Sequence, residues 1–122
     1  MPHSYNPYQG IPYEGDTHHH LLMSVQHCEA TCEQMISMLV TNSQGFEARE
    51  QQIQLLRDCS DICTLMAKYL ARGTNLSLAL ANTCAYICEI CGTTCSQFPD
   101  YHSQHCAQTC LNFANECKAL AG

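Results

Sequence analysis

The segment from Cys84 to Cys95, which reads C-A-Y-I-C-E-I-C-G-T-T-C, constrains the fold more than any other. Its cysteines, Cys84, Cys88, Cys91 and Cys95, are four, three and four residues apart. An α-helix has about 3.6 residues per turn, so this spacing places all of these thiols along one face. The same spacing is typical of the apolar seam by which a helix packs in a bundle. The segment therefore predicts a bundle helix whose buried face is lined with sulfur.

Seam residues at this spacing recur through most of the chain and predict four helices, at about residues 17–41, 46–72, 76–97 and 101–120. Turn signals separate them: N-S-Q-G at 42–45, Gly73, and F-P-D at 98–100. Thr74 or Asn75 can cap the third helix, and Asp100 can cap the fourth. No stretch alternates with a period of two, so no strand is expected. We therefore predict an all-α fold, an antiparallel up-down-up-down four-helix bundle over residues 17–122.

Residues 1–16 differ in composition from the rest, since they contain three of the four prolines. They predict an extended or disordered N-terminal segment. His18, His19 and His20 follow it. Successive helical residues diverge by about 100°, so these side chains are not expected to converge on one metal ion. They are expected at a helix N-terminus or on the surface.

The composition of the chain excludes several classes of protein. The net charge is −6, with only five Lys and Arg residues, which argues against a nucleic-acid partner. No apolar stretch approaches the length expected of a membrane span. The first residues, M-P-H-S-Y-N-P-Y, show no export signal, and an odd number of cysteines cannot all pair. These features predict a cytoplasmic protein with reduced thiols and no membrane partner.

All eleven cysteines lie on the four inward seams, where charged residues are absent. Two or three buried cysteines would need no explanation beyond packing. Eleven are harder to explain, because cysteine buries less apolar surface than the leucine that it replaces. A structural or redox-active bundle remains the alternative to metal binding. The predicted metal ligands are Cys28, Cys32, Cys59, Cys63, Cys84, Cys88, Cys91, Cys95, Cys106, Cys110 and Cys117.

Charge balance favours Cu(I) among the metals that bind thiolates. Soft thiolates select Cu(I), zinc or iron–sulfur clusters. One zinc ion with four thiolates carries a net charge of −2, and the predicted core offers no cation to balance it. One Cu(I) per thiolate leaves no net charge. Two cysteines four residues apart are separated by about 6 Å along the helix, and side-chain rotation can bring their sulfurs to the roughly 4.6 Å of a linear S–Cu–S unit.

Two other kinds of metal site do not fit the sequence. The C-x-x-x-C-x-x-C spacing from Cys84 to Cys91 matches that of the radical S-adenosylmethionine enzymes, but here a fourth cysteine continues the helical face. Ligands strung along one helix cannot surround a compact cluster. The chain contains no Glu-x-x-His, so it lacks the ligands of a di-iron bundle.

The seam pattern resembles that of the bacterial copper storage proteins, most closely their cytosolic branch. The similarity covers residues 55–121 well, and it includes D-C-S-D-I-C at 58–63, Y-I-C-E-I-C-G-T-T-C at 86–95 and N-E-C at 115–117. The resemblance implies a four-helix bundle, often a tetramer, that holds many Cu(I) ions in its interior, protects the cell from free copper and is not an enzyme. Ala81, Ser103 and Phe113 occupy positions where the richest members can carry cysteine, so a lower capacity is expected here.

The predicted topology also distinguishes the two ends of the bundle. Met35 gathers at one end with Cys91, Cys95 and Cys106, and His102 and His105 are expected beside them, where they could assist copper uptake as the resemblance suggests. An ordinary core role for Met35 and a solvated position for the histidines are the alternative. The opposite end is predicted to be an apolar plug of Leu21, Val25, Leu70 and Leu120. The sequence as a whole predicts a cytosolic protein that stores or buffers several Cu(I) ions per chain.

Overall fold

The structure, a computed structural model, describes residues 15–42, 45 and 47–122. It contains four α-helices, α1 (Gly15–Thr41), α2 (Glu50–Arg72), α3 (Leu76–Ser96) and α4 (Tyr101–Ala121). A short 3-10 helix, η2 (Glu47–Arg49), precedes α2. Within the described residues there is no strand. The predicted fold class, an all-α four-helix bundle, is confirmed.

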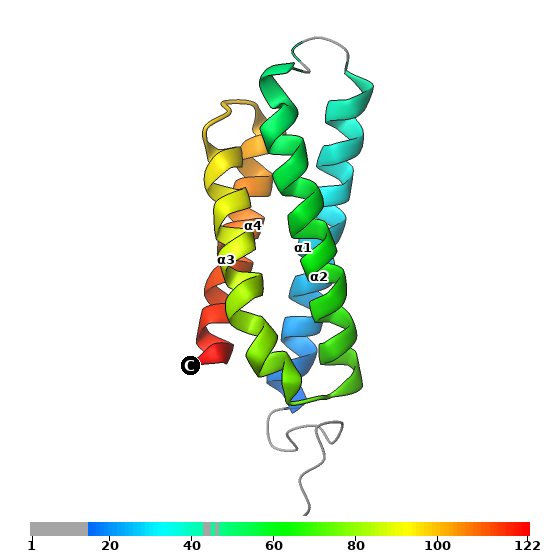
Figure 1. Cartoon of the computed structure of the whole chain (residues 1–122), viewed down its shortest axis with the longest axis vertical. Coiled ribbons are helices and arrows are strands. Elements are labelled where there is room, and N and C mark those ends of the chain that lie inside the picture. The colour runs from blue at the N-terminus through cyan, green and yellow to red at the C-terminus, as the bar shows by residue number, and fades with distance from the viewer. Residues whose placement is uncertain (1–14, 43–44, 46) are drawn as a thin grey trace, which may run out of the picture.

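Neighbouring helices run in opposite directions and form two hairpins, α1 with α2 and α3 with α4 (Figure 1). The α1–α2 and α3–α4 connections lie at the same end of the bundle, which we call the loop end. The α2–α3 connection and the C-terminus lie at the opposite end. The α1–α2 hairpin extends further at the loop end than the α3–α4 hairpin does (Figure 1).

The helix bounds differ from the expected ones by a few residues. Helix α1 begins at Gly15, within the segment 1–16 that was expected to be extended, and residues 1–14 of that segment lie outside the described part of the chain. Helix α2 begins at Glu50, because Glu47–Arg49 form the separate turn η2. Helices α3 and α4 end at Ser96 and Ala121.

The caps that define the connections follow local chemistry. Gly73 ends α2 with a φ of 71°, a left-handed conformation that favours glycine. The Asp100 carboxylate accepts a hydrogen bond of 3.0 Å from the backbone N–H of Ser103 and so caps α4, as predicted. For α3, the hydroxyl of Thr74 accepts from the Leu76 N–H, whereas the side chain of Asn75 makes no capping bond.

The pairs of helices are held together differently. Thr64 and Ser60 of α2 donate hydrogen bonds to Glu29 and Glu33 of α1, the latter at 2.7 Å. Between α3 and α4, the backbones approach closely at the buried Gly92. A Cβ atom there would lie 2.7 Å from Cγ of Leu111 and 3.2 Å from the carbonyl oxygen of Ala107. This position therefore has room only for glycine.

Helix α3 is long and apolar enough, by length and composition, to cross a membrane. No stretch of this length and hydropathy was expected from the sequence, and that expectation was wrong. Part of this apolar character comes from residues that face the bundle core, such as Ala81, Cys88 and Cys91, all of which have no exposed surface, and 39% of the apolar window is buried. Such a helix is weak support for a membrane span, because the core helix of a soluble bundle has the same composition.

Candidate metal core

The eleven cysteines lie together in the interior, and each has an exposed fraction of 0%. They come from all four helices, because each helix turns its cysteine-bearing seam toward the bundle axis. None forms a disulfide. The structure thus places all the predicted ligands in one core. It also places Leu21, Val25 and Leu70 as buried apolar residues and Leu120 as a partly buried one, beyond the cysteines.

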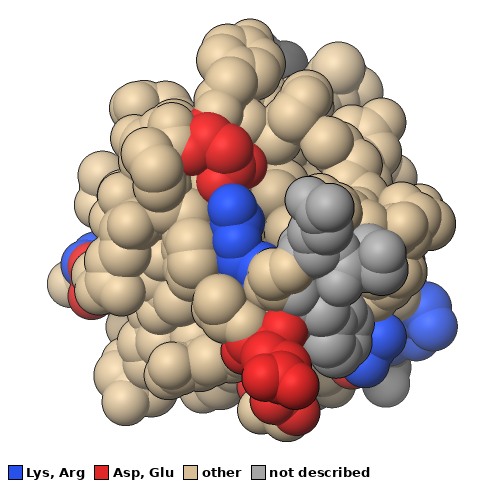
Figure 2. All heavy atoms as spheres, turned by 90° about the horizontal axis from the view of Figure 1, so that it is seen from above, with Lys and Arg blue, Asp and Glu red and all other residues tan. Residues whose placement is uncertain are grey.

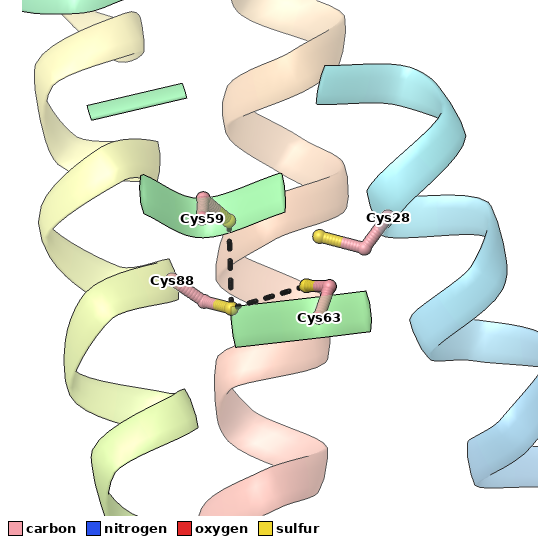
Figure 3. Close-up of side chains that lie close together, drawn as sticks. All are labelled: Cys28, Cys59, Cys63 and Cys88. Carbon is pink, nitrogen blue, oxygen red and sulfur yellow. Dashed lines mark hydrogen bonds between the residues drawn. The ribbon is translucent and has the colours of Figure 1, made fainter. Parts of the chain in front are cut away.

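One group of four thiols lies in the middle of the bundle (Figure 3). Cys28 comes from α1, Cys59 and Cys63 from α2, and Cys88 from α3, and their sulfurs point toward one another. All four sulfurs lie within 4.8 Å of one another. The Cys59–Cys88 and Cys63–Cys88 Sγ distances are 3.6 and 3.9 Å. These distances exceed the roughly 2.05 Å of a disulfide, so the thiols are close neighbours that are not covalently linked.

A second group of four thiols overlaps the first. It consists of Cys28, Cys32, Cys59 and Cys110, again with sulfurs within 4.8 Å of one another. Cys110 lies 3.7 Å from Cys32, 3.9 Å from Cys28 and 4.0 Å from Cys59, measured between Sγ atoms. The two groups share Cys28 and Cys59, so they form one array of sulfur that spans all four helices.

The remaining thiols extend this array toward both ends. Toward the loop end, Cys106 lies 4.0 Å from Cys110, and Cys91 and Cys95 interact with each other. Toward the opposite end, Cys84 interacts with Cys117 and with Cys63. The array therefore continues through more than one layer of the bundle, a geometry that suits several metal ions better than one.

Neighbouring thiols of the core do not all ionise together. The hydrogen bond between Cys84 and Cys117 lowers the pKa of the Cys84 thiol and raises the pKa of Cys117, while burial raises both values. One member of such a pair therefore keeps its proton. None of the buried side chains in the described residues is a lysine or arginine. Negative charge on the sulfurs must thus be balanced by whatever cation enters the core.

A small cleft of about 40 Å³ opens on this core near the loop end, between α1 and α4. Its lining includes Met35 and Met38 of α1, and His102, His105 and Cys106 of α4. The structure thus brings together the methionine and both histidines that the sequence placed at one end. Met38 was missed because it lies off the apolar seam, although it follows Met35 by three residues and so shares a helix surface with it.

Two buried polar residues lie at the loop end of the core, Gln52 and Ser103, and Gln52, which contacts a sulfur, was missed. The buried Nε2 of Gln52 donates hydrogen bonds to Cys95 Sγ at 3.4 Å and to Ser103 Oγ at 3.0 Å. Gln52 precedes the seam residue Leu56 by four residues, so a polar residue on the seam was the available signal. Ser103 was recognised as a seam position without cysteine.

The three consecutive histidines do not converge. His18 is buried and its Nε2 makes no hydrogen bond, whereas His19 and His20 are exposed. His20 Nε2 lies 2.7 Å from the carboxylate of Glu116 on α4. The divergence matches expectation, but the burial of His18 was not foreseen, because His18 lies one turn before Leu21, the first apolar residue that was expected in the core.

A family model described as "Copper storage protein" (Csp) matches residues 14–122. An uncharacterised cysteine-rich protein of Bacillus subtilis, YhjQ, is 38% identical over 69 residues, which are 57% of this chain and 64% of the relative. Less than two thirds of that relative is therefore matched.

Two solved structures share the fold. The Cu(I)-bound copper storage protein BsCsp3 superposes with a TM-score of 0.82 and 27% identity, over 87% of this chain and 99% of the other. A cytosolic copper storage protein from Streptomyces lividans, with five coppers, has a TM-score of 0.83 and 22% identity, over 90% and 96% of the two chains. The second likeness concerns the fold alone.

Proposed function

This chain belongs to the copper storage protein family, and on that basis we propose that it stores or buffers several Cu(I) ions on the thiolates of its core. The observation that carries the proposal is the continuous buried array of eleven thiols, with two overlapping groups of four whose sulfurs lie within 4.8 Å of one another. Packing alone does not account for such an array, because cysteine fills less of a core than leucine.

The charge balance of the core and the distances between its sulfurs support Cu(I) as the metal that is stored. A zinc ion on four thiolates would leave a net charge of −2 in a core without lysine or arginine, whereas one Cu(I) per thiolate leaves none. Neighbouring sulfurs such as those of Cys59 and Cys88 are 3.6 Å apart. A linear S–Cu–S unit needs about 4.6 Å, a change that side-chain rotation can supply. Binding then releases protons, since each thiol must ionise.

We assign the ligand role to all eleven cysteines. Ala81, Ser103 and Phe113 are also fully or almost fully buried, and they take the place of further sulfurs. The capacity is therefore expected to be below that of family members with cysteine at those positions. The ligand set is Cys28, Cys32, Cys59, Cys63, Cys84, Cys88, Cys91, Cys95, Cys106, Cys110 and Cys117.

We further propose that Cu(I) reaches the core through the cleft between α1 and α4. Thioether and imidazole groups are soft or borderline ligands that can hold Cu(I) weakly and pass it on. Met35, His102 and His105 line the cleft together with Cys106, which belongs to the thiol array. Side chains that pass Cu(I) from solvent to a buried thiolate must lie between the two, as these side chains do.

The protein is proposed to act by binding rather than by catalysis, in the cytoplasm and as a homo-oligomer, with a tetramer as the expected assembly. Eleven unpaired thiols suit a reducing compartment. Large apolar side chains are exposed on several helices, among them Met23 on α1, Leu65 on α2 and Tyr86 on α3. Light scattering coupled to gel filtration would measure the mass in solution.

Titration of the reduced, metal-free protein with Cu(I), in the presence of a competing chelator, tests the storage function. We expect several ions per chain to be withheld from the chelator. Uptake of one ion or fewer, with disulfides between helices after mild oxidation, would instead favour the alternative of a structural or redox-active thiol bundle. Protein alkylated at its thiols after unfolding is the matched control for surface binding.

A further inference from the structure

Arg49 lies at the centre of a hydrogen-bond network that crosses the loop end. Its guanidinium donates to Asp100 at 2.7 Å, to Gln52 Oε1 at 2.9 Å and to Ser103 Oγ at 3.1 Å. It also lies 4.2 Å from the centre of the Phe98 ring. Because η2, the α3–α4 connection and α4 all contribute, the network ties the two hairpins together at this end.

The network lies directly on the thiol array. Gln52 and Ser103 have no exposed surface, and Arg49 is half-buried above them. Figure 2 looks onto this end and shows Lys or Arg atoms near the middle of the face, with Asp or Glu atoms on both sides. The axial end of the core is therefore covered by polar groups that bond to one another.

Arg49 determines which way the Gln52 amide faces. The oxygen of the amide accepts from the guanidinium, so the nitrogen is directed inward, to Cys95 Sγ and Ser103 Oγ. The reverse orientation would bring the amide N–H groups against the N–H groups of Arg49. The Cys95 sulfur thus accepts a hydrogen bond from Gln52, and the orientation of Gln52 depends on Arg49, which makes no hydrogen bond to the sulfur.

We propose that Arg49 and Gln52 form a latch that closes the axial end of the core and positions the sulfur of Cys95. Arg49 acts through Gln52, and Ser103 completes the latch at a seam position that lacks cysteine. A consequence, which rests on the proposed function, is that Cu(I) is exchanged through the side cleft between α1 and α4. The closed axial end retains the ions bound at Cys95 and its neighbours.

Alkylation of the metal-free, reduced protein tests the latch without copper. The protein is treated briefly with N-ethylmaleimide and cleaved after Glu89, which separates Cys84 from Cys95 on α3, and the label on each is measured by mass spectrometry. We expect Arg49→Met and Gln52→Met each to raise the labelling rate of Cys95 about tenfold, because hydrogen bonds to charged groups contribute strongly to local closure. The rate of Cys84 should not change.

Three comparisons make this test specific. Arg57→Met, on the exposed face of α2, controls for the loss of one positive charge, and Arg49→Lys should restore part of the protection. If Arg49 acts through Gln52, the double variant should label no faster than either single variant. Unchanged labelling of Cys95, equal increases at Cys95 and Cys84, or additive effects in the double variant would each overturn the latch.

Release of Cu(I) to an excess of bathocuproine disulfonate tests the consequence for metal exchange. We expect Arg49→Met to bind as many ions as the parent protein but to release a fraction of them several-fold faster. Equal release rates would show that the latch does not retain copper. If the parent protein binds one ion or fewer, the storage function fails, whereas the alkylation result still decides whether the latch exists.

Discussion

Cys28 of α1 and Cys59 of α2 belong to both four-thiol groups of the core. Each sulfur is therefore placed to bridge metal ions that the other cysteines hold singly. We expect the Cys28→Ser, Cys59→Ser double variant to lose more Cu(I) ions than the number of thiols removed. The Cys84→Ser, Cys117→Ser variant also removes two thiols, but at one end of the array, and should lose no more than that number. Equal losses in parallel Cu(I) titrations would contradict a bridging role.

The cleft between α1 and α4 can be blocked from its rim. Gln34 lines the cleft and is exposed, so Gln34→Trp should fit on the surface while covering the opening. We expect this variant to take up Cu(I) from a chelator several-fold more slowly, with the same final number of ions, in stopped-flow measurements. Gln54→Trp makes the same change on an exposed position of α2 and should have the parent rate. Equal rates for both variants would exclude the cleft as the route.

Substitutions of Phe113 can distinguish the stability of the fold from the number of Cu(I) ions that the core binds. It is almost fully buried and occupies a seam position between Cys110 and Cys117. Phe113→Cys should destabilise the metal-free protein by about 3 kcal/mol, as large-to-small core changes do, and should raise the number of Cu(I) ions bound. Phe113→Leu should cost about 1.5 kcal/mol or less and leave the number unchanged. Denaturant unfolding and Cu(I) titration of both variants provide the measurements.

Gly92 tests how closely α3 and α4 must approach. A Cβ atom at this position meets Leu111 at 2.7 Å, so Gly92→Ala must push the helices apart. We expect a net destabilisation of about 1–2 kcal/mol, because the packing strain outweighs the roughly 1 kcal/mol by which alanine favours a helix. A Gly92→Ala protein as stable as the parent would contradict the close approach.

Asp100 makes the latch sensitive to acid. Burial alone would raise its pKa, but hydrogen bonds from Arg49 and Ser103 outweigh that effect and lower the pKa below the ordinary value of 3.8. A lowered pKa stabilises the fold above the unfolded-state value, and this contribution is lost as the pH falls through the folded-state value. The stability difference between the parent and Asp100→Asn should therefore be constant near neutral pH and shrink below about pH 4. Asparagine keeps the helix cap, so a difference independent of pH would argue against the ion pair.

The repeating seam made the bundle and its sulfur core predictable, because a cysteine at position i, i+4 or i+7 of a helix must share one face. The loop end was less predictable. The sequence pattern indicated no role for Arg49, because it lies in η2, where the helical repeat does not apply, and its long side chain crosses the end of the bundle. Gln52 obeys the seam but is polar, and its hydrogen bonds with Arg49, Ser103 and Cys95 explain its burial.

The positions of the histidines were also only partly predictable from spacing along one helix. Spacing along α4 placed His102 and His105 at one end, but only the packing of α1 against α4 brings them beside Met38. The burial of His18 likewise depends on where α1 begins, which apolar spacing alone does not determine.

The apolar residues Leu21, Val25 and Leu70 beyond the last thiols have a consequence for the order of metal traffic. A row of binding positions that is closed at its far end fills from that end and releases its ions in the reverse order. If Cu(I) enters only through the cleft near the loop end, as proposed, ions that arrive first would move deepest, toward Cys84 and Cys117, and would leave last. Such a protein would exchange the ions near the apolar end slowly and those near the cleft rapidly, even if every position had the same intrinsic affinity for Cu(I).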